Sequence, residues 1–550
     1  MNLRRRLAAL PLLAALVLLA GCVAIPVSGD VHLERIDVDA DEVPNVVLPP
    51  GPVPGQSQVE IVQGFLSAGR GPQNNYEVAR EFLAPTAEWN GTSRVLVTSS
   101  LVVNPIEVDQ STVSVTVTVV GEVDGSGHYT EVPSQVQTLS YELTTVDGEN
   151  RIARADPGTV LSRNSFAAAF GAYPLYFFDP SFEFLVPDLR WFPVARNVAG
   201  RIVDELLVGP TAWLGPGVLI NAFPQGTTGD AVYRAPEVSV VLGADVRTES
   251  ALTQRRMVDQ LDASLRSLGN VNDVVVTAGE FDLAPAPGDS PPERDYLVRY
   301  GVIGGLDGEF GSLTAEGVAP LSGIGTRADP LQPVAVALSR DRGSVAVLGP
   351  AGVSLVGPSG DPVPIDGRSG LIAPSLDPHG FVWSVPRADP DGLIIVNGEG
   401  EQFPLPLAVD GEVVALEVAR DGARALVALA TANGPRLMVV GVQRNADLVP
   451  VAFGAAYELD TRGAIIDVAW VDGTHVAVLS AGQDGSQVDV LALGGPPEEL
   501  GEIDGATTIV GGDLVAGLRV RLVDGTVYRP SEAGGWRDTG VVASFLGTQQ

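Results

Sequence analysis

The stretch that decides the fold is residues 416–429, which reads LEVARDGARALVAL. An apolar run leads into the pair Asp421 and Gly422, and a second run of apolar residues follows. Three further segments repeat this pattern: residues 338–348 (LSRDRGSVAVL), 375–385 (SLDPHGFVWSV) and 468–479 (VAWVDGTHVAVL). An acid and a glycine between two apolar runs indicate two β-strands joined by a tight turn.

The repeat interval predicts the architecture of the C-terminal half. Gly343, Gly380, Gly422 and Gly473 are spaced 37, 42 and 51 residues apart. Such an interval fits one four-stranded blade per repeat in a β-propeller. A β-sandwich is the rival fold, but it has no reason to repeat one turn at this interval. We therefore expect an all-β propeller of five to seven blades over residues 300–550.

Upstream of the repeats, the sequence predicts an α+β domain over residues 56–165. Val59, Val62 and Phe65 follow helical spacing, and a second helical pattern around residues 76–83 ends before Pro85. Alternating valines at 113–119, a Gly-rich turn at 125–127 and a run at 136–146 then indicate antiparallel strands.

A second α+β domain is expected over residues 180–290. It should contain a helix near 198–208, ended by Gly209 and Pro210, and a longer helix near 249–268. In the longer helix an apolar stripe is expected to face the core; it consists of Val258, Leu261, Leu265 and Leu268. Residues 238–242 and 273–277 are predicted buried strands, and the Pro-rich residues 284–292 are predicted to form a linker or a long loop. The predicted fold class is multidomain, with two N-terminal α+β domains followed by an all-β propeller.

The N-terminus has the form of a lipoprotein signal. Arg4, Arg5 and Arg6 precede an apolar run at 7–20, and Leu-Ala-Gly then leads to Cys22, the only cysteine. This arrangement resembles bacterial lipoprotein signals, so residues 1–21 are a predicted signal peptide. We expect Cys22 to carry an S-diacylglycerol and an N-acyl chain, which would hold the protein on the extracytoplasmic face of the cell membrane. The acidic, Pro-rich residues 22–55 are a predicted tether.

Composition excludes several functions. The chain has a net charge of −33, which disfavours nucleic acid as a partner. All of its basic side chains are arginines, so neither a Walker-type phosphate-binding lysine nor a Schiff-base lysine can be present. Asp37, Asp39 and Asp41 resemble the start of a calcium loop, but Glu42 stands where that loop needs glycine.

No catalytic or metal-binding motif is evident from the residues. The four histidines lie far apart in sequence, at His32, His128, His379 and His475. His379 and His475 fall in blade turns, where an exposed or hydrogen-bonded role is expected. Trp383 and Trp470 are predicted core residues of blades, and Asn90-Gly91-Thr92 is a predicted turn. We expect that the protein is not an enzyme and that it has no cofactor, no metal and no catalytic residue.

With these residues in place, the chain resembles the LpqB family of actinobacterial lipoproteins. The resemblance rests on residues 25–29 (IPVSG), on 202–210 followed by 223–227 (FPQGT), and on the apolar spacing within 260–278. It implies an N-terminal domain, a GerMN domain and a propeller. It further implies contact with the extracytoplasmic domain of the sensor kinase MtrB in a two-component system, with effects on cell-envelope growth and division.

Two classes of function remain after this reading of the sequence. One is a regulatory binding protein for a membrane receptor, and the other is a propeller that binds or hydrolyses cell-wall glycans or peptides. A converging carboxylate or Ser-His constellation at the propeller mouth would favour the second, whereas an apolar patch with a polar rim would favour the first.

Overall fold

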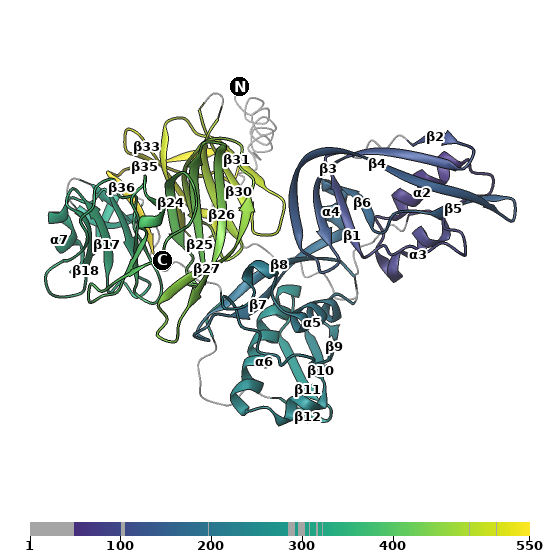
Figure 1. Cartoon of the computed structure of the whole chain (residues 1–550), viewed down its shortest axis with the longest axis horizontal. Coiled ribbons are helices and arrows are strands. Elements are labelled where there is room, and N and C mark those ends of the chain that lie inside the picture. The colour runs from purple at the N-terminus through teal and green to yellow at the C-terminus, as the bar shows by residue number, and fades with distance from the viewer. Residues whose placement is uncertain are drawn as a thin grey trace, which may run out of the picture. The chain divides into compact units, whose positions relative to one another are not determined.

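The computed structural model describes residues 49–100, 105–195, 197–283, 292–294, 303–306, 309–314, 317–321, 323–482, 485–512 and 514–549. Several predictions concern residues outside these ranges. They are the predictions for the signal peptide, for Cys22, for His32, for the Asp37–Asp41 acids and for the linker up to residue 291. The described residues belong to one compact unit of the chain. Figure 1 shows its helices and strands.

The N-terminal domain opens with the two predicted helices. Helix α2 (Gln58–Ala68) begins at a capping box, in which the Ser57 hydroxyl accepts from the Glu60 amide and the Glu60 carboxylate accepts from the Ser57 amide. Helix α3 (Gln73–Glu81) follows and buries Tyr76 and Ala79. Their apolar faces pack on a sheet, as the helical spacing predicted.

That sheet has the order β5-β4-β3-β1-β6, with β2 paired to β3. Its strands are β1 (Arg94–Thr98), β2 (Ile106–Asp109), β3 (Thr112–Asp124), β4 (Tyr129–Val146), β5 (Glu149–Arg154) and β6 (Thr159–Ser162). The alternating valines of β3 are buried against the helices, which confirms the predicted strand. Helix α4 (Arg163–Ala169) contributes to a second apolar cluster together with β1.

The end of the predicted tether lies against this domain. The Gly55 amide donates to the Glu149 carboxylate at 2.7 Å, and the Asn150 side chain donates to the Gln56 carbonyl at 2.9 Å. The last residue of the predicted tether, Gly55, is therefore packed on the folded domain.

The middle domain begins with a long hairpin. Strand β7 (Phe170–Phe178) pairs with β8 (Leu185–Pro193), and helix α5 (Val198–Val208) follows. The remaining elements are η1 (Ala212–Leu214), β9 (Gly229–Arg234), β10 (Glu237–Leu242), η2 (Ala244–Thr248), α6 (Ala251–Leu265), η3 (Arg266–Leu268), β11 (Asp273–Ala278) and β12 (Phe281–Asp282). The helices lie where the sequence places them, and α5 ends at Gly209 as predicted.

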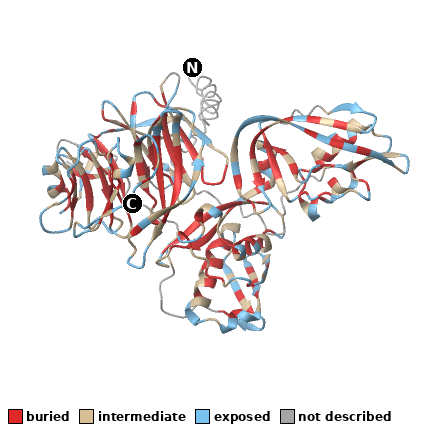
Figure 2. Ribbon diagram, viewed as in Figure 1, coloured by how far each residue is buried: buried red, intermediate tan, exposed pale blue. Residues whose placement is uncertain are grey.

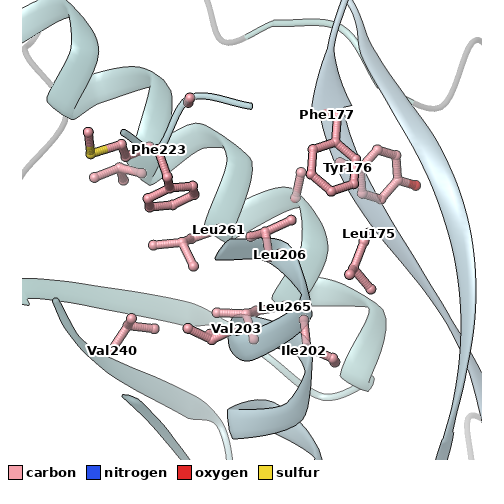
Figure 3. Packing of buried hydrophobic residues seen from close by; sticks show 14 of the residues in the cluster. Leu175, Tyr176, Phe177, Ile202, Val203, Leu206, Phe223, Val240, Leu261 and Leu265 are labelled. Atoms are coloured by element: carbon pink, nitrogen blue, oxygen red, sulfur yellow. The ribbon is translucent and has the colours of Figure 1, made fainter. Parts of the chain in front are cut away.

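One core holds the middle domain together. Figure 3 shows side chains of α5 and α6 gathered with Val240 of β10 and Leu175 of β7. Val258, Leu261 and Leu265 of α6 are buried, and Leu268 of η3 is partly buried against the same core, which confirms the predicted stripe. The prediction that β10 and β11 are buried strands needs correction, because Val241 is 51% exposed. The two strands pair in parallel within a four-stranded sheet, and the helices cover only one of its faces.

The C-terminal half is the predicted propeller, and its described strands form six blades of four. Blade 1 comprises β16 (Ala335–Leu338), β17 (Val345–Gly349), β18 (Gly352–Val356) and β19 (Val363–Asp366). Blade 2 comprises β20 (Ser375–Leu376), β21 (Val382–Ser384), β22 (Ile394–Val396) and β23 (Gln402–Pro404). Blade 3 comprises β24 (Glu412–Val418), β25 (Arg424–Thr431), β26 (Gly434–Arg444) and β27 (Pro450–Leu459).

Blade 4 comprises β28 (Ile465–Trp470), β29 (His475–Ala481), β30 (Ser486–Ala492) and β31 (Glu498–Glu502). Blade 5 comprises β32 (Ala506–Gly512), β33 (Leu514–Leu522), β34 (Thr526–Pro530) and β35 (Trp536–Val542). Blade 6 combines the two ends of the propeller, because the C-terminal strand β36 (Phe545–Gln549) pairs with β13 (Ile303–Leu306), which continues into β14 (Glu309–Thr314) and β15 (Gly317–Pro320). Strand β36 also pairs with β16 of blade 1, so the ring is closed. Figure 2 shows the blade strands to be largely buried and their turns exposed.

The repeated acid has a structural role in every blade where the sequence repeat occurs. It lies in the turn between the first and second strands and accepts from backbone amides. Asp341 Oδ1 accepts from Gly343 at 2.7 Å, and Asp421 Oδ1 accepts from Ala423 at 2.9 Å. A carboxylate that fixes a turn in this way explains why the motif recurs in blades 1 to 4.

Candidate functional site

A cavity of about 310 Å³ lies between the hairpin of the middle domain and the turns of the propeller. This volume is at the lower end of the range for small-ligand sites. Strands β7 and β8 form one wall, the first turns of blades 3 and 4 form the opposite wall, and blade 5 adds one residue. The lining residues are Pro174, Tyr176, Pro187, Ala419, Arg420, Asp421, Arg424, Trp470, Val471, Asp472, Gly473, Thr474 and Leu514.

The propeller wall of the cavity is built on a buried ion pair. Arg424 Nη2 lies 2.5 Å from Asp421 Oδ2, and both side chains are only 1% exposed. Arg424 also donates from Nη1 to the Gly473 carbonyl at 2.7 Å, which joins blade 3 to blade 4. Its guanidinium carbon lies 5.1 Å from the centre of the Trp470 ring. Charge, hydrogen bonds and ring contact together hold this wall in one geometry.

The hairpin wall is held in place by contacts beside the cavity. Trp191 of β8 donates from its indole nitrogen to the Gly494 carbonyl of blade 4 at 2.7 Å. Trp213 of η1 stacks on Tyr457 of blade 3, with ring centroids 5.4 Å apart and planes inclined by 27°. The middle domain is therefore packed on the propeller through aromatic and hydrogen-bonded contacts, which fixes the shape of the cavity.

Next to the cavity lie two carboxyl groups with raised pKa values. Burial raises the pKa of Glu417 to about 8, and the nearby charge of Asp467 adds to this rise. Burial also raises the pKa of Asp467 to about 7, although hydrogen bonds from the Ile509 and Val468 amides oppose it. Glu417 lies on β24 and accepts from the Trp470 amide at 3.3 Å. Both side chains are half-buried. The raised pKa of Glu417 favours its protonated form near neutral pH.

A Thr-His-Asp cluster borders the cavity, but its geometry does not form a proton relay. Thr474 Oγ1 lies 3.0 Å from His475 Nδ1, and Asp472 Oδ1 lies 3.0 Å from the same nitrogen. A catalytic triad needs the hydroxyl and the carboxylate on opposite ring nitrogens. The Asp472 carboxylate also accepts from the backbone amides of Thr474 and His475, so the cluster stabilises the blade 4 turn.

The other residues singled out from the sequence occupy structural positions. Trp383 is buried in blade 2, as predicted. The Asn90 side chain accepts from the Thr92 amide at 3.1 Å, which confirms the predicted turn. His379 differs from its prediction, because its ring packs edge-on against Phe184 of the middle domain and its Nε2 is buried without a hydrogen bond.

The remaining candidates concern metal, membrane and the lipidation site. His128 packs against the ring of Tyr457, and burial lowers its pKa. Within the described ranges, no group of three or more His, Cys, Asp or Glu side chains could hold a metal ion. Over the same ranges, no helix is both long and apolar enough to cross a membrane. The lipidation prediction for Cys22 stays a prediction, since that residue is outside the described part of the chain.

Sequence reasoning placed Asp421, Trp470 and Gly473 in the blades but did not predict that they line a cavity. It missed the two neighbouring carboxyl groups. Glu417 and Asp467 stand inside the apolar runs VVALEV and AIIDVAW, and an acid within a buried strand was the available signal. Arg424 gave a similar signal, because it is a charged residue between the repeated turn and the apolar run that follows it. Leu514 gave no signal, because it reaches the cavity from blade 5, and local sequence does not show which blades meet the middle domain.

The fold and site define a multidomain protein that places two α+β domains ahead of a six-bladed propeller. A family model for the N-terminal domain of lipoprotein LpqB matches residues 51–167, and one for the LpqB β-propeller domain matches 308–539. A model described as sporulation and spore germination matches residues 174–280, the domain predicted as GerMN-like. The chain belongs to the LpqB family of lipoproteins.

Relatives of this family span nearly the whole chain. Lipoprotein LpqB of Thermobifida fusca is 28% identical over 517 residues, which cover 86% of this chain and 79% of the relative. The Rhodococcus jostii protein of the same name is 24% identical and covers 90% of each chain. Among solved structures, TolB from Acinetobacter baumannii matches with a TM-score of 0.31 at 14% identity, over 58% of this chain and 82% of that chain.

Proposed function

We propose that this lipoprotein is a non-enzymatic binding protein, held by lipid on the extracytoplasmic face of the cell membrane, that binds the outer domain of an MtrB-like sensor kinase. By binding, it would regulate a two-component system that affects cell-envelope growth and division. The observation that carries the proposal is the packed junction of the middle domain with the propeller, which presents a fixed, largely apolar cavity. Membership of a lipoprotein family supports the anchor.

Anchoring matters for the strength of binding that regulation requires. Lipid on Cys22 would confine the protein to the surface where a membrane receptor also resides. Two proteins held at one surface meet at a high effective concentration, so a micromolar affinity in solution suffices. Because the chain carries a net charge of −33, a basic patch on the partner would speed association, and salt would slow it.

A second candidate function is the binding or hydrolysis of cell-wall glycans or peptides. The observation in its favour is the pair Glu417 and Asp467, whose pKa values of about 8 and about 7 suit proton transfer near neutral pH. Against it stands the Thr474 and His475 geometry, which provides no activated nucleophile.

Calorimetry and a cellular assay test the proposal together. The folded body from residue 49 onward would be titrated with the kinase outer domain at two salt concentrations, and kinase output would be measured in cells without the lipoprotein. We expect micromolar binding, weaker binding at high salt, and altered kinase output. Absence of binding at high micromolar concentration together with unchanged output would refute the receptor role.

A matched pair of variants separates the two functions. Glu417→Gln removes one of the two ionisable carboxyl groups of the pair. Glu412→Gln alters an exposed position of the same strand. If the protein acts on a receptor, we expect both variants to bind the kinase outer domain with the same affinity. Release of product from cell-wall material by the native chain, lost only in Glu417→Gln, would establish the second function instead.

A further inference from the structure

The walls of the cavity are mostly flat and apolar. Pro174 and Tyr176 of β7, Pro187 of β8, and Trp470 and Val471 of blade 4 all line it. Ring faces and guanidinium planes pack favourably against aromatic rings. Arg424 already contributes such a plane, since it lies over the Trp470 ring. The shape and chemistry of these walls therefore suit a flat, apolar occupant.

Several polar groups of the lining already have protein partners. The Arg424 guanidinium donates to Asp421 and to the Gly473 carbonyl. The Asp472 carboxylate accepts from two backbone amides and contacts the His475 ring. An apolar group that entered the cavity would leave these groups paired, so their desolvation would cost little.

Leu514 at the edge of the cavity is both exposed and strained. Its side chain is 59% exposed, although leucine is usually buried, and its backbone has φ +58°, in the left-handed region that only glycine adopts readily. It begins strand β33 beside an irregularity in the pairing of β32 with β33. Strain of this kind persists where the surrounding structure enforces it, and it concentrates at binding sites.

The cavity also continues an interface that is already formed. Pro187 of the hairpin packs close to Gly473 in the first turn of blade 4, and the same turn continues into the lining of the open cavity. The apolar surface that seats the middle domain is thus only partly covered by it. Because the cavity continues a contact in which polypeptide already packs on polypeptide, between two domains of the chain, its surface suits a polypeptide occupant better than a free metabolite.

We propose that this cavity is an anchor pocket for an aromatic side chain presented by a loop of the partner protein, with Leu514 forming its outer edge. The inference rests on the proposed function as a binding protein and names the chemistry of the contact. One buried aromatic anchor in a preformed pocket commonly dominates the affinity of an interface.

Two variants of exposed apolar residues test the pocket. Leu514→Asn keeps a residue that tolerates the left-handed backbone but removes the apolar edge, and Val523→Asn alters an exposed valine away from the cavity as a control. In calorimetric titration with the partner's outer domain, we expect Leu514→Asn to bind about tenfold more weakly and Val523→Asn to bind as the native chain does. Equal affinities for both variants and the native chain would overturn the inference.

A small probe makes the outcome independent of the partner. N-acetyl-phenylalanine amide should bind the native chain saturably in ligand-observed NMR and compete with the partner, whereas N-acetyl-alanine amide should do neither. If the native chain fails to bind the kinase domain, the proposed function is wrong, and the probe alone then judges the pocket. Probe binding that is unchanged in Leu514→Asn, or undetectable in the native chain, would overturn the pocket.

Discussion

Replacing Glu417 with glutamine should stabilise the protein at pH 8 and leave it nearly unchanged at pH 4.5. The amide retains an oxygen that can accept from the Trp470 backbone, so the hydrogen bond at 3.3 Å is preserved while the ionisable proton is lost. Burial raises the pKa of Glu417 from 4.5 in the unfolded chain to about 8 in the fold. The folded protein therefore holds this proton at pH values where the unfolded chain releases it.

The sign of the effect follows from this difference in proton binding. A carboxyl whose pKa is raised by folding favours the folded state fully below pH 4.5, and this contribution is lost as the pH rises toward 8. At about 1.4 kcal/mol for each pH unit, the loss has an upper limit near 5 kcal/mol. Because Glu417 is only half-buried, we expect about 2 kcal/mol at pH 8. For a domain of the propeller's size, a gain of about 2 kcal/mol corresponds to a rise of about 4–8 °C in Tm.

Differential scanning calorimetry of the native chain and of Glu417→Gln from pH 4.5 to 8.5 measures this effect. Glu412→Gln, at the exposed start of the same strand, is the control and should follow the native chain. The gap in Tm between Glu417→Gln and the native chain should widen steadily as the pH rises. A constant gap, or identical curves, would refute the account of the raised pKa.

Four further outcomes are expected. Cys22→Ala should abolish membrane association, so that cell fractionation after a high-salt wash finds the protein in the soluble fraction; retention in the pellet would reveal another anchor. Arg424→Met should lower the free energy of unfolding by about 3–5 kcal/mol in denaturant titration because it leaves a buried carboxylate unpaired, whereas Arg436→Met, at an exposed pair, should cost less than about 1 kcal/mol. Trp191→Phe removes one hydrogen bond between the middle domain and the propeller and should speed proteolysis at that junction; an unchanged digestion rate would show the bond to be unimportant. Deletion of residues 545–549 removes an inner strand that pairs with two others, so the propeller should lose its cooperative thermal transition, and a sharp native-like transition would contradict closure by β36.

Local sequence was enough to predict those elements whose apolar residues follow a clear period. Helix α5 ends at Gly209 because glycine reaches φ +114° there, a conformation that the sequence signalled directly. The repeated acid and glycine predicted the blade turns for the same reason, because both residue types act on the backbone within a few positions. The six blades fall within the predicted five to seven.

Burial of the middle-domain strands could not be predicted from their composition. The runs around Val240 and Val275 are rich in valine and leucine, which is typical of strands covered on both faces. In the structure the helices cover one face only, and Val241 and Val275 point away from them. Coverage of a sheet depends on how many helices the chain supplies and where they pack, and a strand's own sequence does not contain that information.

By itself, the sequence determined the domain order, the α+β and all-β classes, the blade turns and the lipoprotein family, because each of these depends on local periodicity or on residues close together in the chain. Only the tertiary structure decided the site. The cavity brings together Tyr176, Arg424, Trp470 and Leu514, which lie far apart in the chain. They meet because blades 3, 4 and 5 are neighbours in the ring and the hairpin packs on their turns. The raised pKa of Glu417 has the same origin, since burial by neighbouring blades, and not the sequence around the residue, removes water from its carboxyl group.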